Sequence, residues 1–225
     1  MDKVFIDHIL FEPDINTLLQ RLRIKPESSS ADALVSLLSD VQAIANPKAL
    51  YKQAYVEEKG QDYVVIDGIR FTSRILRVNL DTTYHVFPFL ATCGVELERY
   101  ANSIDDLLQR FWVDTIMEFA LYAAVETLQN HLTEHHQPGI ASMNPGSLED
   151  WPLTQQQPLF DLLGRAREAT GVQLTDSFLM VPVKSVSGIY FPTEESFVNC
   201  QLCPREICPG RRAPYDPTLM GKRYS

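Results

Sequence analysis

The chain has 225 residues, 45% of them hydrophobic and 22% charged, which is the balance of a globular protein with a sizeable core. Lys and Arg number 20 against 29 Asp and Glu, and the net charge of −9 argues against non-specific binding to nucleic acid, which requires positive charge. The opening MDKVFIDHILFEPD has acids inside its apolar run, so no signal peptide is expected, and no apolar run is long enough for a membrane helix. We therefore expect a soluble cytoplasmic protein with reduced thiols.

The first third of the chain predicts two helices and a hairpin. Leucines recur at helical spacing in residues 14–24 and 31–45. Within residues 62–73, two β-branched and aromatic runs flank Asp67-Gly68, a pair that suits a tight type I′ turn. Residues 84–94 predict another strand, and Pro88 inside it indicates an edge or a bulge.

The middle of the chain predicts one long helix, from near Ser103 to just before residue 137. Ser103 is a suitable cap, and Asp105 and Asp106 would lie in the first turn, where the helix dipole favours acids. The apolar stripe along this helix is broad, which indicates burial against a sheet or several helices.

The last third predicts a loop, a helix and two strands before an irregular end. Residues 140–154 are rich in Gly, Pro, Ser and Asn, and residues 156–170 predict a helix ended by Gly171. Two strands follow, SFLMVPV and SGIYFP. Helices mixed with antiparallel hairpins define an α+β fold.

Residues 171–192, GVQLTDSFLMVPVKSVSGIYFP, together with Pro145-Gly146 and Trp151-Pro152 upstream, resemble the activation domain of cobalamin-dependent methionine synthase. The resemblance extends over about residues 45–195. It implies a helmet-like single domain, residues 1–198, with a central, mostly antiparallel twisted sheet flanked by helices, the long helix near 103–136 among them. Residues 199–225 are then a basic, irregular, cysteine-containing tail packed on or near this domain.

The resemblance also implies a function. In that family the domain binds S-adenosylmethionine and presents its methyl group to cobalamin for reductive reactivation. The chain is thus expected to be a stand-alone activation module that docks on a corrinoid protein, as part of a methyltransferase system rather than as an independent catalyst. It lacks the Asp-x-His-x-x-Gly motif of cobalamin-binding domains, so cobalamin would come only with a partner.

The ligand-binding residues of the family must be compared with this sequence position by position. The family loop Arg-x-x-Pro-Gly-Tyr corresponds here to residues 142–147, where Ser142 replaces the Arg and Ser147 replaces the Tyr. A hydroxyl cannot replace a guanidinium as the bidentate partner of a carboxylate, so the charge would have to come from elsewhere, with Arg211 and Arg212 as candidates. The predicted ligand-binding residues are Asn144, Pro145, Gly146, Ser187, Gly188 and Tyr190.

Three cysteines lie together in the tail, as Cys200-x-x-Cys203-x-x-x-x-Cys208. Thiolates are soft ligands that suit zinc or an iron–sulfur cluster, and Cys93 is the only candidate for a fourth thiolate. Reduced structural thiols and a C-x-x-C redox pair are the alternatives. The pattern leaves two further functions open, an iron–sulfur protein that transfers electrons to corrinoids and a zinc-stapled interaction domain.

Other patterns are weaker. His131 and His135 have a metal-binding i, i+4 spacing, but histidines at a helix end are more often solvated capping residues. Glu126 is expected on the same side of the long helix as the ligand site. No phosphate-binding loop, G-x-S-x-G or H-E-x-x-H motif is present.

Overall fold

The computed structural model describes residues 3–136, 139–193, 198–208 and 211–224. Within them, eight strands form one antiparallel sheet in the order β1-β2-β6-β3-β4-β5, and β10 pairs with both β6 and β7. The strands are β1 Lys3–Ile6, β2 Lys48–Lys52, β3 Ala54–Lys59, β4 Tyr63–Ile66, β5 Ile69–Thr72, β6 His85–Thr92, β7 Ile140–Met143 and β10 Ser185–Pro192. A small second sheet joins β8 Gln173–Leu174 to β9 Met180–Val181. The predicted α+β class with a central antiparallel sheet is confirmed.

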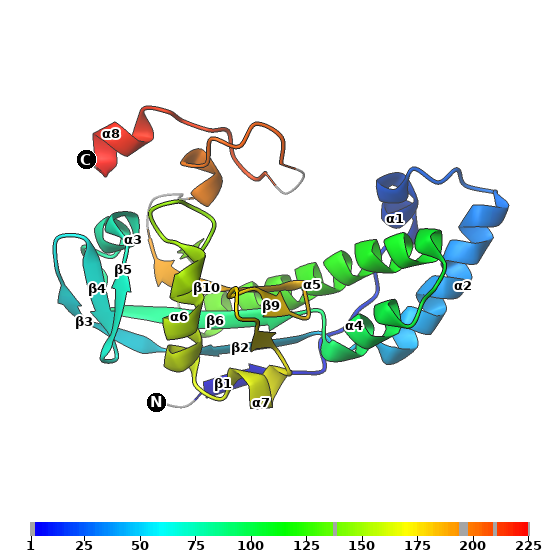
Figure 1. Ribbon diagram of the computed structural model, residues 1–225, viewed down its shortest axis with the longest axis horizontal. Helices are drawn as coiled ribbons and strands as arrows, with labels where there is room; N and C mark the ends of the chain where they lie inside the picture. Colours follow the sequence, from blue (N-terminus) through cyan, green and yellow to red (C-terminus); the bar gives the residue numbers. More distant parts are fainter. Residues whose placement is uncertain (1–2, 137–138, 194–197, 209–210, 225) are drawn as a thin grey trace.

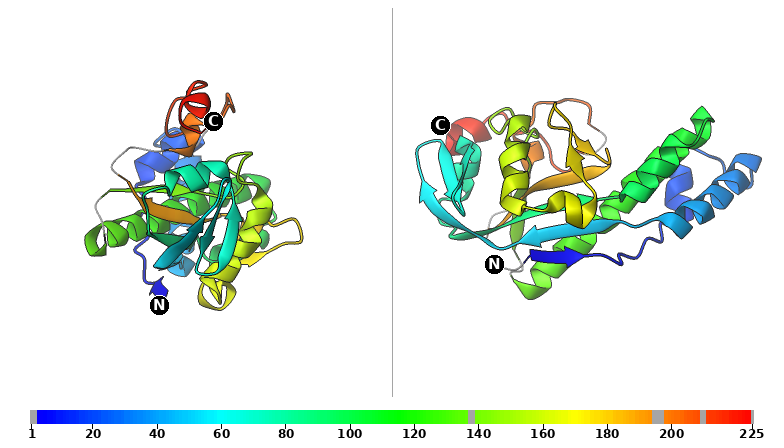
Figure 2. Two further views of the ribbon diagram at one scale, coloured as in Figure 1. Left: turned by 90° about the vertical axis from the view of Figure 1, so that its left-hand side faces the viewer. Right: turned by 60° about the horizontal axis from the view of Figure 1, so that its bottom comes forward.

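The longest helix joins the sheet to a helical arm. In Figure 1, α5 lies along the sheet at one end and against α1, α2 and α4 at the other, and Figure 2 shows this arm projecting from the body. Among the described residues, none of the helices is long and apolar enough to cross a membrane. The helices are α1 Ile15–Leu22, α2 Ser29–Ile44, α3 Arg74–Asn79, α4 Val95–Asn102, α5 Leu107–His135, α6 Gln156–Leu163, α7 Ala166–Thr170 and α8 Leu219–Arg223, with short 3₁₀ turns η1 Leu153–Gln155 and η2 Asn199–Gln201.

Strand β6 is buried on both faces, because different helices cover its two sides. Phe87, Phe89 and Ala91 pack in one cluster with Ala124, Leu128 and Leu132 of α5. Leu90 points the other way and packs with Leu163 and Ala166 of α6 and α7. The alternation follows from the two-residue period of a strand and explains why β6 is a nearly continuous apolar run.

The expectation that Pro88 marks an edge or a bulge is wrong. Strand β6 is central, with β10 on one side and both β2 and β3 on the other. On that second side, pairing with β2 stops at Phe89 and pairing with β3 resumes at Val86. Pro88 lies at the junction between β2 and β3 and pairs with neither, while on the other side it stays opposite Ile189 of β10.

Several helix boundaries differ from those predicted. Asp106, not Ser103, caps the long helix by accepting a hydrogen bond from the backbone of Gln109, while Ser103 ends the separate helix α4. The predicted helix 156–170 is broken into α6 and α7, because Gly164 and Arg165 both have positive φ. Residues 140–143, predicted as loop, form β7 because they pair with the end of β10.

The hairpin at residues 62–73 forms as expected. Ile66 pairs with Ile69, and Asp67 and Gly68 adopt φ values of 44° and 78°, the left-handed conformation that this turn requires. The Asp67 carboxylate also forms an ion pair with Lys52, 2.8 Å away, which ties the turn to β2.

The C-terminal tail crosses the domain and is fixed at its far end. The backbone N–H of Asp216 bonds to the carbonyl of Gln201 at 2.8 Å, closing the tail on itself. Tyr224 is only 2% exposed; its hydroxyl donates to Asn79 Oδ1 at 2.9 Å, and its carbonyl accepts from Arg74 Nε at 2.7 Å. The described residues 198–208 and 211–224 therefore form a strap, held beside Asn144 at one end and at α3 at the other.

Removing the Tyr224 hydroxyl tests this anchor. Tyr224→Phe leaves the buried acceptor of Asn79 without its partner, and we expect the free energy of unfolding to fall by about 1–2 kcal/mol in urea denaturation. Tyr215→Phe is the matched control, since Tyr215 lies in the same strap but is 45% exposed. Equal stability of the Tyr224→Phe variant and the wild type would show that this bond does not hold the strap.

Candidate functional site

A cavity of about 720 Å³ opens between α5, the sheet and the strap. Helix α5 supplies most of one wall, β6 and β10 form the floor, β7 and the residue after it form one side, and the strap supplies two arginines. The lining residues are Phe89, Leu121, Tyr122, Val125, Glu126, Gln129, Ser142, Asn144, Val186, Tyr190, Arg211 and Arg212. We call this cavity the α5 pocket.

Tyr190 and Asn144, both predicted from the sequence, line the α5 pocket. Tyr190 is 2% exposed, stacks on Phe89 with ring centroids 4.3 Å apart, and accepts a hydrogen bond from Gln129 Nε2 at 2.9 Å. Burial raises the pKa of the Tyr190 hydroxyl to about 12, so it stays a neutral phenol at physiological pH. Its position on the pocket floor is therefore fixed by packing from both sides.

Asn144 is held at the pocket by close contact with β10. Its Nδ2 donates to the carbonyl of Ser187 at 2.8 Å. A Cβ on Gly188 would lie 2.3 Å from the carbonyl oxygen of Met143 and 2.5 Å from Asn144 Nδ2. Gly188 is thus required for the close approach of the two strands. It positions Asn144 and does not itself line the pocket.

The predicted site residues do not all come together. Ser187 is 1% exposed and points to the opposite face of the sheet, where its hydroxyl donates to Gln156 Oε1 at 2.5 Å. Pro145 is buried, and Gly146 lines a separate cavity of about 800 Å³ beside Leu202 and Cys203 of the strap. The sequence missed Gln129, although it lies one helical turn after Glu126 on α5 and this spacing could have indicated it.

The positive charge missing at Ser142 is supplied by the strap. Both Arg211 and Arg212 line the α5 pocket together with Ser142. The Arg211 guanidinium is used within the strap, where it bonds to backbone carbonyls. The Arg212 side chain is exposed, and its guanidinium has no hydrogen bond or ion pair with any residue that the structure describes. Arg212 is therefore the cation that can reach a ligand, and Glu126 supplies an acid to the same pocket.

A buried polar atom lies next to this site. Asn199 is 5% exposed and donates through Nδ2 to Asn144 Oδ1 at 3.3 Å. Its own Oδ1 is buried without a hydrogen-bond partner within the described part of the chain. An unpaired buried acceptor costs free energy, and this one belongs to the residue that holds Asn144 at the α5 pocket.

The four cysteines lie in two separate places. Cys93 is fully buried in the core of the helical arm, and burial raises the pKa of its thiol to about 12. Cys200, Cys203 and Cys208 are partly exposed thiols in the strap. Within residues 3–136, 139–193, 198–208 and 211–224, no three His, Cys, Asp or Glu side chains lie close enough to hold a metal ion as they stand. The metal site stays a prediction, and the structure does not bring Cys93 to it.

Cys200 has a distinct environment among the strap thiols. Its sulfur accepts a hydrogen bond from the backbone N–H of Arg212 at 3.4 Å. Partial burial acts to raise the pKa of this thiol, but backbone hydrogen bonds from Arg212 and Ala213 and the charges of both arginines outweigh it, and the net pKa is lowered. The thiol thus adjoins the arginine pair of the α5 pocket.

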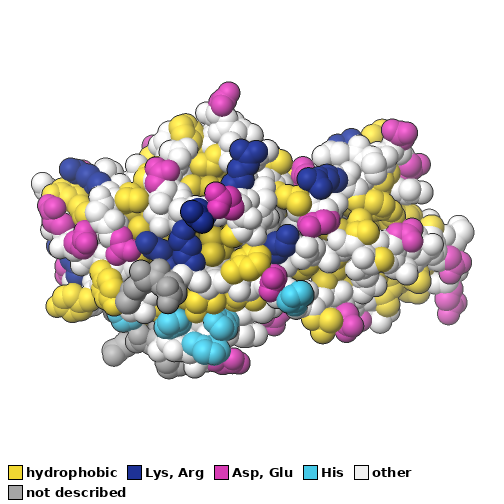
Figure 3. All heavy atoms as spheres, turned by 90° about the horizontal axis from the view of Figure 1, so that it is seen from below, with side chains coloured by type: hydrophobic (Ala, Val, Ile, Leu, Met, Phe, Trp, Pro, Cys, Tyr) yellow, Lys and Arg dark blue, Asp and Glu magenta, His cyan; other side chains and the backbone are white. Residues whose placement is uncertain are grey.

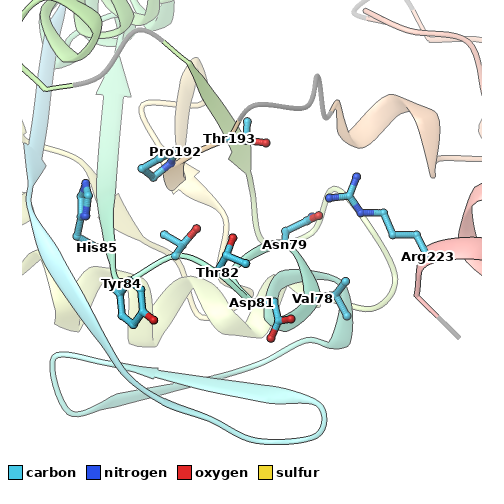
Figure 4. A pocket seen from close by; sticks show the side chains of 10 residues that line it. Val78, Asn79, Asp81, Thr82, Tyr84, His85, Pro192, Thr193 and Arg223 are labelled. Carbon is cyan, nitrogen blue, oxygen red and sulfur yellow. The ribbon is translucent and has the colours of Figure 1, made fainter.

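A second polar cavity, of about 580 Å³, lies between α3, β6 and the end of β10 (Figure 4). Asn79 and Arg223 lie on one side of it, and Tyr84 and His85 on the other. None of the residues predicted to bind a ligand lines this cavity, so the α5 pocket is the better candidate site.

The histidines at the end of α5 gather around Tyr51 and Phe87. Figure 3 shows histidine side chains clustered on one part of the surface. His131 stacks on His135 with centroids 4.1 Å apart, and His136 Nε2 lies 3.0 Å from the Tyr51 hydroxyl. Partial burial first, and then repulsion from the neighbouring histidines, lower the pKa of His131 and His136. These rings pack against the sheet and cap the helix, and no metal site forms among them.

Comparison with known proteins identifies the fold. The chain resembles the solved reactivation domain of MetH bound to AdoHcy, with a TM-score of 0.62 and 16% sequence identity over 88% of this chain and 81% of that one. This likeness establishes a shared fold. Residues 117–200 also match the family model for the activation domain of vitamin B12-dependent methionine synthase. The matched range contains residues 171–192, the segment in which the resemblance to this family is most specific. No curated protein matches the chain.

The histidine cluster predicts how stability depends on pH. A lowered pKa means that the folded state favours neutral rings, so the unfolded state binds more protons below the ordinary histidine pKa of 6.5. The contribution of the neutral histidine cluster to the free energy of unfolding is complete above pH 6.5 and is lost as the pH falls below it. We expect the free energy of unfolding to decrease between about pH 7.5 and about pH 5.5, and to decrease less in His136→Gln.

The control is His8→Gln, because His8 lies outside the cluster and its side chain is 93% exposed. Urea denaturation at several pH values measures the effect. An unchanged pH dependence in His136→Gln would show that the cluster does not set it.

Proposed function

We propose that this chain is an activation-type module of a cobalamin-dependent methyltransferase system, which binds S-adenosylmethionine in the α5 pocket and docks on a corrinoid protein. The observation that carries the proposal is the meeting of Arg212, Tyr190 and Asn144 in one pocket, although the sequence lacks the family arginine in the loop. The family match over residues 117–200 supports the same assignment.

Each wall of the α5 pocket suits one part of such a ligand. The guanidinium of Arg212 is the natural partner of the amino-acid carboxylate, and the carboxylate of Glu126 can accept hydrogen bonds from the α-ammonium group. Phe89, Val125 and Val186 offer apolar surface to the adenosyl portion. Asn144 offers its side-chain amide at the side of the same pocket, held in place by Ser187 and Asn199. The residues present therefore fit the ligand.

The protein contributes binding and orientation rather than chemical groups. When bound, the ligand supplies an activated methyl group on a sulfonium, and the corrinoid partner supplies the acceptor. Neutral Tyr190 and buried Phe89 keep the pocket floor rigid, so the methyl group is held in one direction. The relative with a solved structure was crystallised with AdoHcy, a ligand of the same class. Docking on the corrinoid protein and a cytoplasmic location are part of the proposal.

Calorimetric titration with S-adenosylmethionine tests the ligand. We expect saturable binding to the wild type, weakened about 10- to 100-fold in Arg212→Ala because a charge-assisted hydrogen-bonded pair is lost. Arg205→Ala is the matched control, since Arg205 belongs to the same strap but lines the separate cavity beside Leu202 and Cys203. No binding by the wild type, or equal loss in both variants, would contradict the assignment of the α5 pocket.

A further inference from the structure

The cysteine loop of the strap is folded around a single residue, Arg211. Its guanidinium donates from Nη1 to the carbonyl of Cys200 at 3.1 Å and from Nη2 to the carbonyl of Cys203 at 3.2 Å. Its backbone N–H donates to the carbonyl of Cys208 at 3.1 Å. All three cysteine carbonyls are therefore bonded to one residue, although the cysteines span nine positions of the sequence.

Two further contacts are typical of thiolate sites. The backbone N–H of Cys203 bonds back to the carbonyl of Cys200 at 3.3 Å, so the C-x-x-C segment forms a tight turn. The backbone N–H of Arg212 points at Cys200 Sγ, 3.4 Å away. Backbone N–H groups that bond to sulfur stabilise metal-bound thiolates and tune their clusters.

The three side chains do not converge in the present conformation. Cys200 Sγ faces the backbone of Arg212, whereas Cys203 packs at the edge of the core cluster that contains Ile75 and Leu148. Rotation about Cα–Cβ moves each sulfur and leaves the carbonyl bonded to Arg211. With Cys200 Sγ kept against the N–H of Arg212, metal binding requires Cys203 and Cys208 to turn their sulfurs toward it.

We propose that Cys200, Cys203 and Cys208 form a thiolate metal site, for a zinc ion or an iron–sulfur cluster, with one coordination position left open to solvent or a ligand. Three thiolates around such a centre leave net negative charge, which the guanidinium groups of Arg211 and Arg212 offset. An open fourth position is the arrangement of catalytic rather than structural metal sites. Cys93, buried in the helical arm, takes no part.

The site also bears on the α5 pocket, a consequence that rests on the proposed function. Arg212 bonds to Cys200 through its backbone and lines the pocket through its side chain. A metal that fixes the Cys200 sulfur fixes the backbone of Arg212 with it. Metal binding is thus expected to hold the carboxylate-binding cation in the pocket and to strengthen ligand binding.

Metal content after anaerobic purification of the full chain is the direct test. We expect stoichiometric zinc, or iron with acid-labile sulfide and a charge-transfer absorption band, in the wild type and in Cys93→Ala. Cys200→Ser, Cys203→Ser and Cys208→Ser should each lose most of the metal, with circular dichroism to verify folding. Alkylation counted by mass spectrometry gives a second readout, because metal-bound thiolates resist the reagent and the same thiols react after chelation.

The outcomes separate the metal site from the proposed function. Absence of stoichiometric metal, together with no uptake of zinc or of a reconstituted cluster, overturns the site. Metal retained equally in the three serine variants also overturns it, because the bound metal is then held elsewhere. Metal bound by these cysteines without any S-adenosylmethionine binding supports the site and refutes the proposed function. If both bind, chelation should weaken the ligand in the wild type but not in Arg212→Ala.

Discussion

The antiparallel pairing of β10 with β6 is the constraint on which the candidate site depends. Its register sets Gly188 opposite Phe89 and Tyr190 opposite Phe87, so these residues share the face that α5 covers. Because side chains alternate along a strand, Ser187 and Ile189 must face the other helices. A shift of one residue would remove Tyr190 from the pocket and bury the Ser187 hydroxyl under α5. The close approach at Gly188 then positions Asn144, and through it Asn199 and the start of the strap.

The chain departs from the loop pattern of the family it resembles, and the strap supplies the charge that the loop lacks. The loop at residues 142–147 has serine where the family has arginine, and the strap brings two arginines to the same pocket from about seventy residues further along the chain. Arg211 organises the strap through backbone carbonyls, which leaves Arg212 available to a ligand. Tyr224 fixes the far end of the strap under α3. Because Arg212 also bonds to Cys200 through its backbone, the cation of the pocket is tied to the cysteine segment of the strap.

Local signals predicted much of the fold. The Asp67-Gly68 turn, the helices in residues 14–45 and the helix end at Gly171 follow from hydrogen bonding and φ preferences that a few neighbouring residues decide. Two of the errors have a common cause. Pro88 is central because the neighbours of β6 change at that point, and β7 exists because β10 is there to pair with it. Both facts depend on strands far away in the sequence.

For the site, the sequence by itself determined the family resemblance, the candidates Asn144 and Tyr190, the loss of the loop arginine and the presence of three tail cysteines. Only the tertiary structure decided that Arg212 lies beside Ser142, that Gly146 and Ser187 face away from the pocket, and that Cys93 is remote from the other thiols. The physical reason is that sequence fixes which groups are available and their local geometry, whereas register, helix packing and the return of the strap decide which of them meet.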